Sequence, residues 1–278
     1  MAGFQNINQI INALTVNGKG QVEFWTKTGP TTVAAGNYSL WRAAGLPTVG
    51  ADPASLNDTN CDSTTIGAMS FTNPTSPATL HLINSWATSP TVGSTGTLLL
   101  VDRLMGYGNI NANVNTLQSF TNDGAIPRYT TGDGVMMFLE VTTALGATAS
   151  NATIIYTNQA GTGSKSTGAQ TMVVSSIANR IPTAFQFFPL ASGDSGVRSV
   201  QSIQFSAAML AGVANLVLCR PLMAIPLALV GVAGQVDMTV QMPMLPQIKD
   251  GACLQWIFIA PAASTTPVFS GQINVAEN

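Results

Sequence analysis

The chain has 278 residues, of which 46% are hydrophobic and only 8% are Asp, Glu, Lys or Arg, against roughly 25% charged residues in a typical soluble domain. Ten basic and twelve acidic residues give a net charge of −2, with no run of Lys or Arg. These values exclude a disordered chain, which combines low hydrophobicity with high charge, and they leave no basic footprint for direct contact with nucleic acid. Because ions are the groups most costly to bury, we expect an exterior that neighbouring subunits cover; a monomer with a neutral surface is the alternative.

The cysteines and the apolar segments constrain the environment of the chain. Cys61, Cys219 and Cys253 are odd in number and far apart, so free thiols are expected rather than a disulfide framework. The first residues lack the basic and apolar regions of a signal peptide. The most apolar stretch, residues 219–232, is too short for a membrane span, and Pro221 and Pro226 interrupt it.

The N-terminal segment predicts an amphipathic helix that ends at Asn17-Gly18. Its polar side is entirely uncharged. A helix this short is marginal in water and needs a surface to pack on, which is either its own domain or an adjacent subunit. Its apolar residues fall at helical spacing: Phe4, Ile7, Ile10, Ile11 and Leu14.

The rest of the sequence predicts strands separated by Gly-, Asn- and Thr-rich turns. Residues 44–66 and 109–134 read as long loops, and 106–109 as a turn. The pattern favours an all-β fold, a jelly-roll-like β-sandwich with a short N-terminal helix. We divide the chain into a helical arm (1–18), an N-terminal β region (19–108) and a β-sandwich region (109–278), which could form one continuous unit with the preceding region. The expected strands are residues 21–26, 38–41, 67–71, 95–104, 135–142, 152–157, 171–174, 181–190, 197–207, 214–218 and 254–260.

One motif favours an enzymatic alternative. Residues 193–196, Gly-Asp-Ser-Gly, resemble the nucleophile loop of trypsin-like serine proteases, and His81 and Asp102 precede Ser195 in the order that a catalytic triad would need. The surrounding residues do not match that family, since Val197 stands where a further Gly belongs and Thr79-Leu80 precedes the histidine. A β-turn between strands explains residues 192–196 fully, and we favour it over the protease interpretation.

Other chemical motifs are weak. His81 is the only histidine, so no metal-ligand cluster follows from local spacing. Asp52, Asp58 and Asp62 are close enough in sequence to bind a hard cation, but they fit no EF-hand pattern. The Gly-rich residues 161–166 superficially match a phosphate loop, although a hairpin turn explains them better. We therefore expect no catalytic residue, no metal and no cofactor.

Several segments of the second and third quarters of the chain form a distinctive series: LLLVDRL at 98–104, RYTTGDGVM at 128–136, LEVT at 139–142, LGATA at 145–149, IYTNQAGT at 155–162, and PL at 189–190 followed by GDSGVRSVQS at 193–202. Together they resemble structural proteins of tailed-bacteriophage virions. The resemblance lies within residues 95–220 and implies a β-sandwich protein built into a phage particle, without catalytic residues.

The expected function is therefore a non-enzymatic capsid decoration or cement protein that bridges capsomers of a bacteriophage head. Its expected partners are further copies of itself, for example in a trimer, and the major capsid protein, without direct nucleic-acid or membrane contact. The alternatives are a major capsid or tail protein and, from another class, a carbohydrate-binding β-sandwich that uses Tyr107, Asn109 and Asn111. The candidate interface residues are Phe4, Ile7, Ile10, Ile11, Leu14, Trp25 and Trp41.

Overall fold

The structure is a computed structural model that describes residues 4–172, 181–241 and 245–278. Two short helices and eighteen strands are assigned within these ranges, and the strands form three antiparallel sheets. The predicted all-β sandwich with a short N-terminal helix is confirmed. Residues 173 and 174, the end of one predicted strand, lie outside the described residues.

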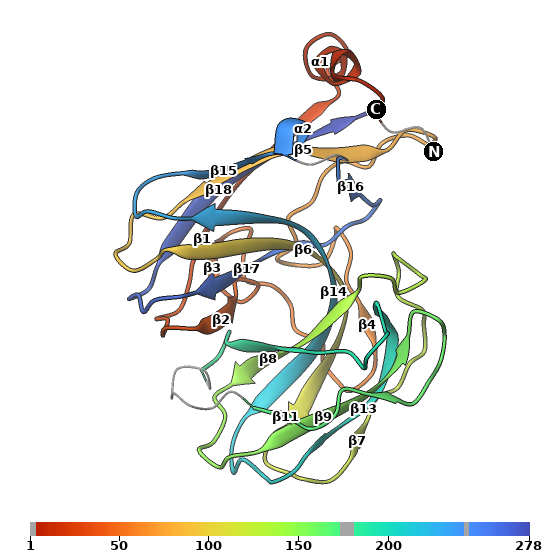
Figure 1. Ribbon diagram of the computed structural model, residues 1–278, viewed down its shortest axis with the longest axis vertical. Coiled ribbons are helices and arrows are strands. Elements are labelled where there is room, and N and C mark those ends of the chain that lie inside the picture. Colours follow the sequence, from red (N-terminus) through yellow and green to blue (C-terminus); the bar gives the residue numbers. More distant parts are fainter. Residues whose placement is uncertain (1–3, 173–180, 242–244) are drawn as a thin grey trace.

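The upper sheet in Figure 1 has the strand order β15-β5-β18-β1-β3, and β16 also pairs with β5. The helix α1 lies on this sheet, and α2 follows directly after β15. Their bounds are α1 (Ile7–Thr15), β1 (Gly20–Thr28), β3 (Ala44–Leu46), β5 (Leu80–Thr88), β15 (Gly234–Asp237), α2 (Met238–Gln241), β16 (Gln247–Ile248) and β18 (Val268–Glu277).

The central sheet has the order β12-β8-β14-β6-β17-β2, and β4 also pairs with β6. Its two longest strands, β6 and β14, run side by side through both halves of the molecule (Figure 1). The bounds are β2 (Gly36–Ser39), β4 (Thr59–Asn60), β6 (Gly96–Asn111), β8 (Met136–Thr143), β12 (Phe185–Phe188), β14 (Val213–Leu227) and β17 (Leu254–Ala260).

The lower sheet has the order β10-β9-β13-β7, and β11 also pairs with β9. The Gly-rich residues 161–164 connect β9 to β10 as a hairpin, as the sequence predicted. The bounds are β7 (Gln118–Ser119), β9 (Asn151–Asn158), β10 (Lys165–Ser166), β11 (Gln170–Thr171) and β13 (Val197–Phe205).

Two apolar cores lie at the two ends of the β6–β14 ribbon. The upper core joins the upper sheet to the first half of β6, where Leu98 and Leu100 pack with Trp25 and Trp256. The lower core joins the lower sheet to the second half of β6, where Tyr107 packs with Tyr156 and other residues. Because one pair of long strands contributes to both cores, the two lobes share a continuous backbone. The predicted division at residue 108 is not tested by these observations and stays a prediction.

The central sheet also curls so that its two edges meet. Tyr38, in β2, forms an isolated antiparallel bridge with Ala184, just before β12. Beside it, the Ser39 N–H donates to the Thr183 carbonyl at 2.8 Å. A third cluster of buried side chains fills the inside of the curl: Val101, Phe138, Phe185, Val217, Cys219 and Ile257.

Four charged side chains are buried at the junction of the two lobes, which we call the waist: Asp102, Arg103, Arg128 and Glu140. Arg103 Nη1 donates to Glu140 Oε2 at 3.3 Å and to Gln255 Oε1 at 3.1 Å. Arg128 binds both carboxylate oxygens of Asp102, at 2.9 and 2.7 Å. Buried charges persist when they are paired and hydrogen-bonded, so the waist is a polar clamp between two apolar cores.

The structure corrects some sequence expectations. Residues 106–109 are not a turn but continue β6. The reason is tertiary: a Cβ on Gly106 would lie 2.6 Å from Pro53 Cγ, and one on Gly108 would collide with the Pro53 carbonyl oxygen. These glycines therefore let the loop around Pro53 cross the sheet closely, which is a known use of glycine in strands.

Further corrections concern strand boundaries and pairing. Residues 67–71 form only a bridge, Met69 with Leu254. The strand predicted at 214–218 continues to Leu227 through Pro221 and Pro226. Beyond Cys219, β14 pairs within the central sheet with β6 alone, and prolines are tolerated on such an edge. The predicted strands 135–142 and 152–157 exist, but they lie in different sheets.

Candidate interaction surface

The helix α1 begins and ends where its local sequence allows. The Asn6 side chain accepts a hydrogen bond from the Gln9 N–H at 3.0 Å, which caps the first turn. Gly18 has a φ of +63°, and the Lys19 N–H donates to the Ala13 carbonyl at 2.9 Å just beyond the last turn. The chain then turns directly into β1, so the helix is placed against the outer face of the upper sheet.

The helix α1 packs on the upper sheet through one row of its apolar residues. Ile10 and Ala13 are buried against Ile83 and Ala276 of the upper sheet. Phe4 packs edge-on against His81, with ring centroids 5.5 Å apart. This contact confirms the expectation that the helix needs a surface, and the surface within this chain is its own upper sheet.

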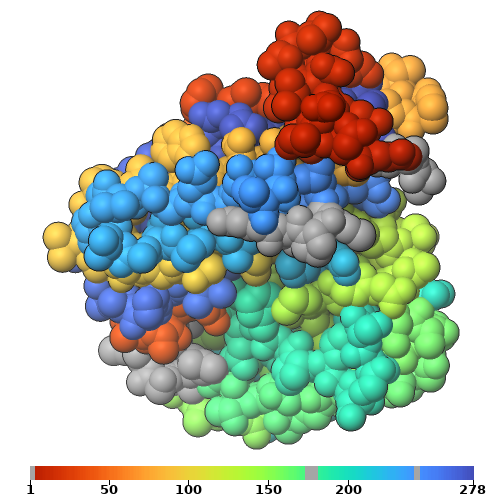
Figure 2. Space-filling model, turned by 45° about the horizontal axis from the view of Figure 1, so that its top comes forward, coloured from red at the N-terminus to blue at the C-terminus, as the bar shows by residue number. Residues whose placement is uncertain are grey.

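A second apolar stripe of the same helix, next to the first, is left largely exposed. Ile7, Ile11 and Leu14 are 53%, 49% and 40% exposed. Figure 2 shows α1, in red, protruding from the molecule as a ridge. The helix therefore has more apolar surface than its own domain covers, and exposed apolar patches of this kind mark interaction sites.

The exposed stripe continues onto the sheet. A Cβ built on Gly20 would come within 2.9 Å of Leu14 Cδ2, so Leu14 lies directly over the start of β1. Val22 and Phe24 follow Gly20 at alternate positions and therefore share its face of the strand. They are 51% and 59% exposed. We call Ile7, Ile11, Leu14, Val22 and Phe24 the apolar ridge.

Neutral polar side chains continue the surface across the neighbouring strands. The register pairs Val22 with Asn274 and Phe24 with Gln272 of β18, and these two residues lie opposite Asn84 and Trp86 of β5. Asn274 donates to Asn84, and the Trp86 Nε1–H donates to Gln272 Oε1 at 3.3 Å. This ladder of amides presents no charge to a partner, so covering it avoids the desolvation penalty of ions.

Charged groups occur at the margin of this surface. The ion pair between Lys19 and Glu277, with an N–O distance of 2.9 Å, lies next to the C-terminal end of α1. Asp237, where β15 ends, accepts hydrogen bonds from the N–H and hydroxyl of Thr239. An uncharged centre with charges at the rim is the composition expected of a protein–protein contact.

The predicted interface residues fall into two groups. Ile7, Ile11 and Leu14 are exposed on α1, whereas Ile10 is buried beneath the helix. Trp25 and Trp41 lie in the interior, at 2% and 1% exposure, and offer no surface to a partner in the folded chain. The aromatic side chain of Phe24 was a secondary candidate from the sequence, and it is exposed. Sequence reasoning missed Val22, for which the available signal was its place on the same strand face as Phe24, opposite to Trp25.

A pocket of about 1,070 Å³ lies beneath the first turn of α1. Phe4, Ile10, His81, Arg220 and Lys249 are among its described lining residues, which include no carboxylate. Burial lowers the pKa of His81.

The residues of the protease hypothesis are not brought together. The Ser195 hydroxyl donates to Asp133 Oδ1 at 2.9 Å. Asp102 is bound by Arg128, and His81 contacts Thr79 and Leu245 on the upper sheet. No histidine reaches Ser195 through any described contact, so the Ser–His–Asp triad required for acyl transfer is not formed.

The loop acids and the candidate sugar-binding group also have local structural partners. Asp52 binds Arg42 and Asn215, Asp58 caps the N–H groups of residues 123 and 124, and Asp62 binds Thr64 and Thr65. Tyr107 is fully buried, so the carbohydrate hypothesis loses its aromatic platform. Among the described residues, no three His, Cys, Asp or Glu side chains group as metal ligands, and no described helix is long and apolar enough to span a membrane.

Comparisons with known proteins give little further information. No protein-family model matches the chain, and no curated protein matches it significantly. Among solved structures it is similar to the VP2 subviral particle of infectious bursal disease virus, at 10% identity and a TM-score of 0.18, with 98% of this chain and 86% of that chain covered. T=1 particles derived from the same virus give 11% identity and a TM-score of 0.16, with 96% and 82% covered. Similarity this low carries no argument about function.

Proposed function

We propose that the protein is a non-enzymatic structural component of a bacteriophage particle, a decoration or cement protein that bridges capsomers on the head. The observation that carries this proposal is the apolar ridge beside an uncharged sheet face. Its support in the sequence is the low charge of the whole chain and the resemblance of residues 95–220 to tailed-phage virion proteins.

The mechanism of such a protein is mechanical. Apolar area removed from water contributes about 25 cal/mol per Å², and a standard protein contact buries roughly 1,600 Å² in total. A partner that covers the apolar ridge and the amide ladder gains the free energy of burying apolar area and does not have to desolvate ions. Each bridge between capsomers therefore raises the free energy needed to separate them under the outward pressure of packaged DNA.

The first test is the composition of purified particles. Mass spectrometry of phage particles should detect this chain, and labelled protein should rebind particles that lack it. Absence of the chain from purified particles would remove the proposal. Localisation of the label on the head rather than the tail distinguishes a decoration protein from a tail component.

The second test asks whether the ridge makes the contact. The double variant Ile11→Asp/Phe24→Asp should reduce particle binding by at least about tenfold, since each carboxylate would have to be desolvated in the contact. Val92→Asp is the matched control, because Val92 is 83% exposed and lies outside the ridge. Wild-type binding by the double variant would place the contact elsewhere.

The proposed partners are the major capsid protein and further copies of this chain, for which a trimer is one closed symmetric arrangement. Sedimentation of the free protein and of the same two variants separates these contacts. Loss of self-association in the ridge variant, with the control unchanged, assigns the ridge to the homo-oligomer; unchanged self-association with reduced particle binding assigns it to the capsid.

A further inference from the structure

Two of the three cysteines meet at a gap in the central sheet. The strand β4 pairs with residues 105 and 106 of β6, and the Cys61 N–H then donates to the Leu104 carbonyl at 2.9 Å. The strand β17 pairs with residues 97–102, and the Cys253 carbonyl accepts from the Arg103 N–H at 2.8 Å. Because β14 occupies the other edge of β6 along its whole length, β4 and β17 lie end to end on the same edge.

Cys61 comes directly after the end of β4, and Cys253 comes directly before the start of β17. The two cysteines therefore lie where the two strands meet end to end. Residues 61 and 253 are far apart in sequence but take consecutive places along β6, opposite residues 104 and 103. The two side chains pack in one small buried cluster with Trp41.

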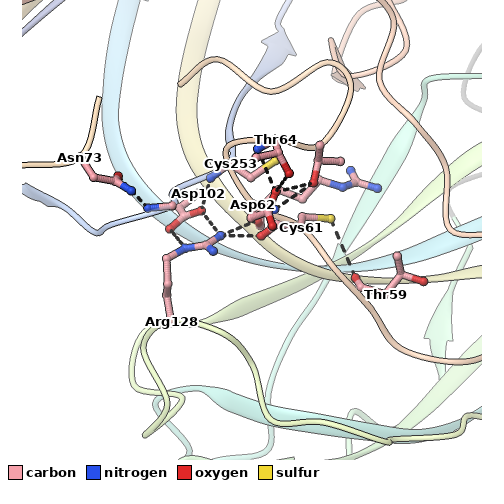
Figure 3. Close-up of polar contacts among 11 residues, drawn as sticks. Thr59, Cys61, Asp62, Thr64, Asn73, Asp102, Arg128 and Cys253 are labelled. Atoms are coloured by element: carbon pink, nitrogen blue, oxygen red, sulfur yellow. Dashed lines mark hydrogen bonds and ion pairs between the residues drawn. The ribbon is translucent and has the colours of Figure 1, made fainter. Parts of the chain in front are cut away.

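One ion pair fixes both backbones. Arg128 Nη2 donates to the Cys61 carbonyl at 2.8 Å and to Asp102 Oδ1 at 2.7 Å. The same Asp102 oxygen accepts the Cys253 N–H at 3.0 Å. Figure 3 shows Cys61, Cys253, Asp102 and Arg128 together at this point of the sheet. The two cysteines are thus held at a fixed separation by the waist rather than by chance proximity of mobile loops.

We propose that Cys61 and Cys253 form an intramolecular disulfide when the protein meets an oxidising low-molecular-weight disulfide, which staples the loop that carries Cys61 to the central sheet. Cys219, inside the curl of the sheet, takes no part. In the context of the proposed function, the bond would form once a particle leaves the reducing cytoplasm; the chemistry itself does not depend on that function.

The reaction is a balanced thiol–disulfide exchange. The Cys61 thiolate attacks a sulfur of the small disulfide, which releases one thiolate and leaves a mixed disulfide on Cys61. Cys253 loses its proton and attacks the Cys61 sulfur, which releases the second small thiolate. Two protein thiols are oxidised, one small disulfide is reduced to two thiols, and the two protons pass to the released thiolates or to solvent.

The local electrostatics favour Cys61 as the attacking sulfur. The neighbouring Cys253 thiol, with Arg103 and Arg128, lowers the pKa of the Cys61 thiol to about 7, although burial opposes this shift. The pKa of Cys253 is raised, first by the neighbouring Cys61 thiol and then by burial. Burial likewise raises the pKa of Cys219 to about 12, which leaves it inert near neutral pH.

The test uses the purified full chain and oxidised glutathione. Incubation near neutral pH should lower the mass by about 2 Da relative to the reduced protein, and peptide mapping without reductant should join the peptides of Cys61 and Cys253. The closed loop is long, so the oxidised form should melt higher by about 5–10 °C. A parallel incubation in mild urea, followed by its removal, gives the oxidant access if the native fold shields both thiols.

Three variants give the controls. Cys61→Ala and Cys253→Ala should both lose the 2-Da shift and the rise in melting temperature, whereas Cys219→Ala should keep them. A stable glutathione adduct on Cys61 in the wild type, of about +305 Da, a bond to Cys219, or unchanged mass in both incubations would each overturn the proposal. None of these readouts requires a phage particle, so failure here and failure of the proposed function are distinguishable.

Discussion

The waist and the outer face of the upper sheet use polar residues in opposite ways. Five charged side chains are buried among the described residues, namely Lys27, Asp102, Arg103, Arg128 and Glu140, although the whole chain has only ten basic and twelve acidic residues. The outer face beside α1 is instead lined by amides, and its apolar residues are exposed. Four of these five buried charges lie where the two lobes join, whereas the outer face beside α1 has charged groups at its margin.

This contrast shows that a low charge content of the chain does not mean that its interior is free of charges. A buried ion pair is weak evidence for stability, because its desolvation can exceed its Coulombic gain, but breaking it leaves an uncompensated charge. At the waist, the pairs also fix geometry, since Arg103 and Arg128 connect strands of the central sheet and the loop that carries Cys61. The neutral outer face has no such constraint and is free to be covered.

The largest effect is expected at the Arg103–Glu140 pair, where both side chains have no exposed area. Arg103→Met should lower the free energy of unfolding by about 3–5 kcal/mol, because Glu140 is left buried without its cation. The double variant Arg103→Met/Glu140→Leu should recover most of that loss. Urea unfolding of the single variants and the double variant measures the coupling as a double-mutant cycle.

Additive losses in the double variant would contradict this interpretation. They would mean that Arg103 acts mainly through packing, for which its contact with the Trp41 ring, 4.8 Å from the guanidinium carbon to the ring centroid, is the available cause. Arg42→Met is a matched control, since Arg42 is only partly buried and its pair with Asp52 is solvent-accessible.

The next prediction compares the free energy of unfolding of variants at two neighbouring residues of β1, Phe24 and Trp25. Trp25 points into the upper core, 4.8 Å between ring centroids from Trp256, whereas Phe24 points outward. Trp25→Ala should lower the unfolding free energy by about 3 kcal/mol or more, and Phe24→Ala should change it by less than about 0.5 kcal/mol. Thermal and urea unfolding of the isolated protein measure both. A large loss for Phe24→Ala would show that the ridge is part of the fold rather than a free surface.

Local patterns predicted the elements that they alone determine. The spacing of Ile7, Ile10 and Leu14 predicts a helix, and alternation at 21–26 predicts a strand, since one face of each is apolar. The spacing does not distinguish Ile10, which is buried, from Ile7 and Ile11, which are exposed, because that choice depends on where β5 and β18 lie. Trp25 and Trp41 are both buried in the folded chain. For Trp25 the sequence does not show which face of its strand another sheet will cover, and Trp41 lies in a turn after β2, where no alternation indicates burial.

Other features required the tertiary structure. Gly106 and Gly108 read as turn residues until Pro53 is seen to cross them. Asp102 and Arg103 lie in an otherwise apolar run, and nothing local identifies Arg128 and Glu140 as their partners. The meeting of Cys61 with Cys253 depends on two separate strands pairing with the same edge of β6. Long-range pairing of this kind leaves no periodic signal in the sequence.

A further effect is expected at Lys27, a buried cation that pairs with no carboxylate among the described residues. Its Nζ donates to the carbonyls of Ala43, Pro47 and Thr48 at 3.1, 2.7 and 3.1 Å. Burial lowers the pKa of Lys27 from 10.5 to about 8. Between these values the unfolded chain holds a proton that the folded chain has released, so the unfolding free energy should rise as the pH increases from about 8 to 10.5.

Comparing the wild type with Lys27→Met isolates the contribution of Lys27 to the pH dependence of stability, because all other titrating groups are present in both proteins. The unfolding free energy of the wild type minus that of the variant should increase by about 1–3 kcal/mol between pH 7.5 and 10.5, as measured by urea unfolding at each pH. A constant difference would mean that the three carbonyls hold the ammonium ion as firmly as water does. A buried cation in this protein would then need no carboxylate partner, and the pairing at the waist would serve to position strands rather than to neutralise charge.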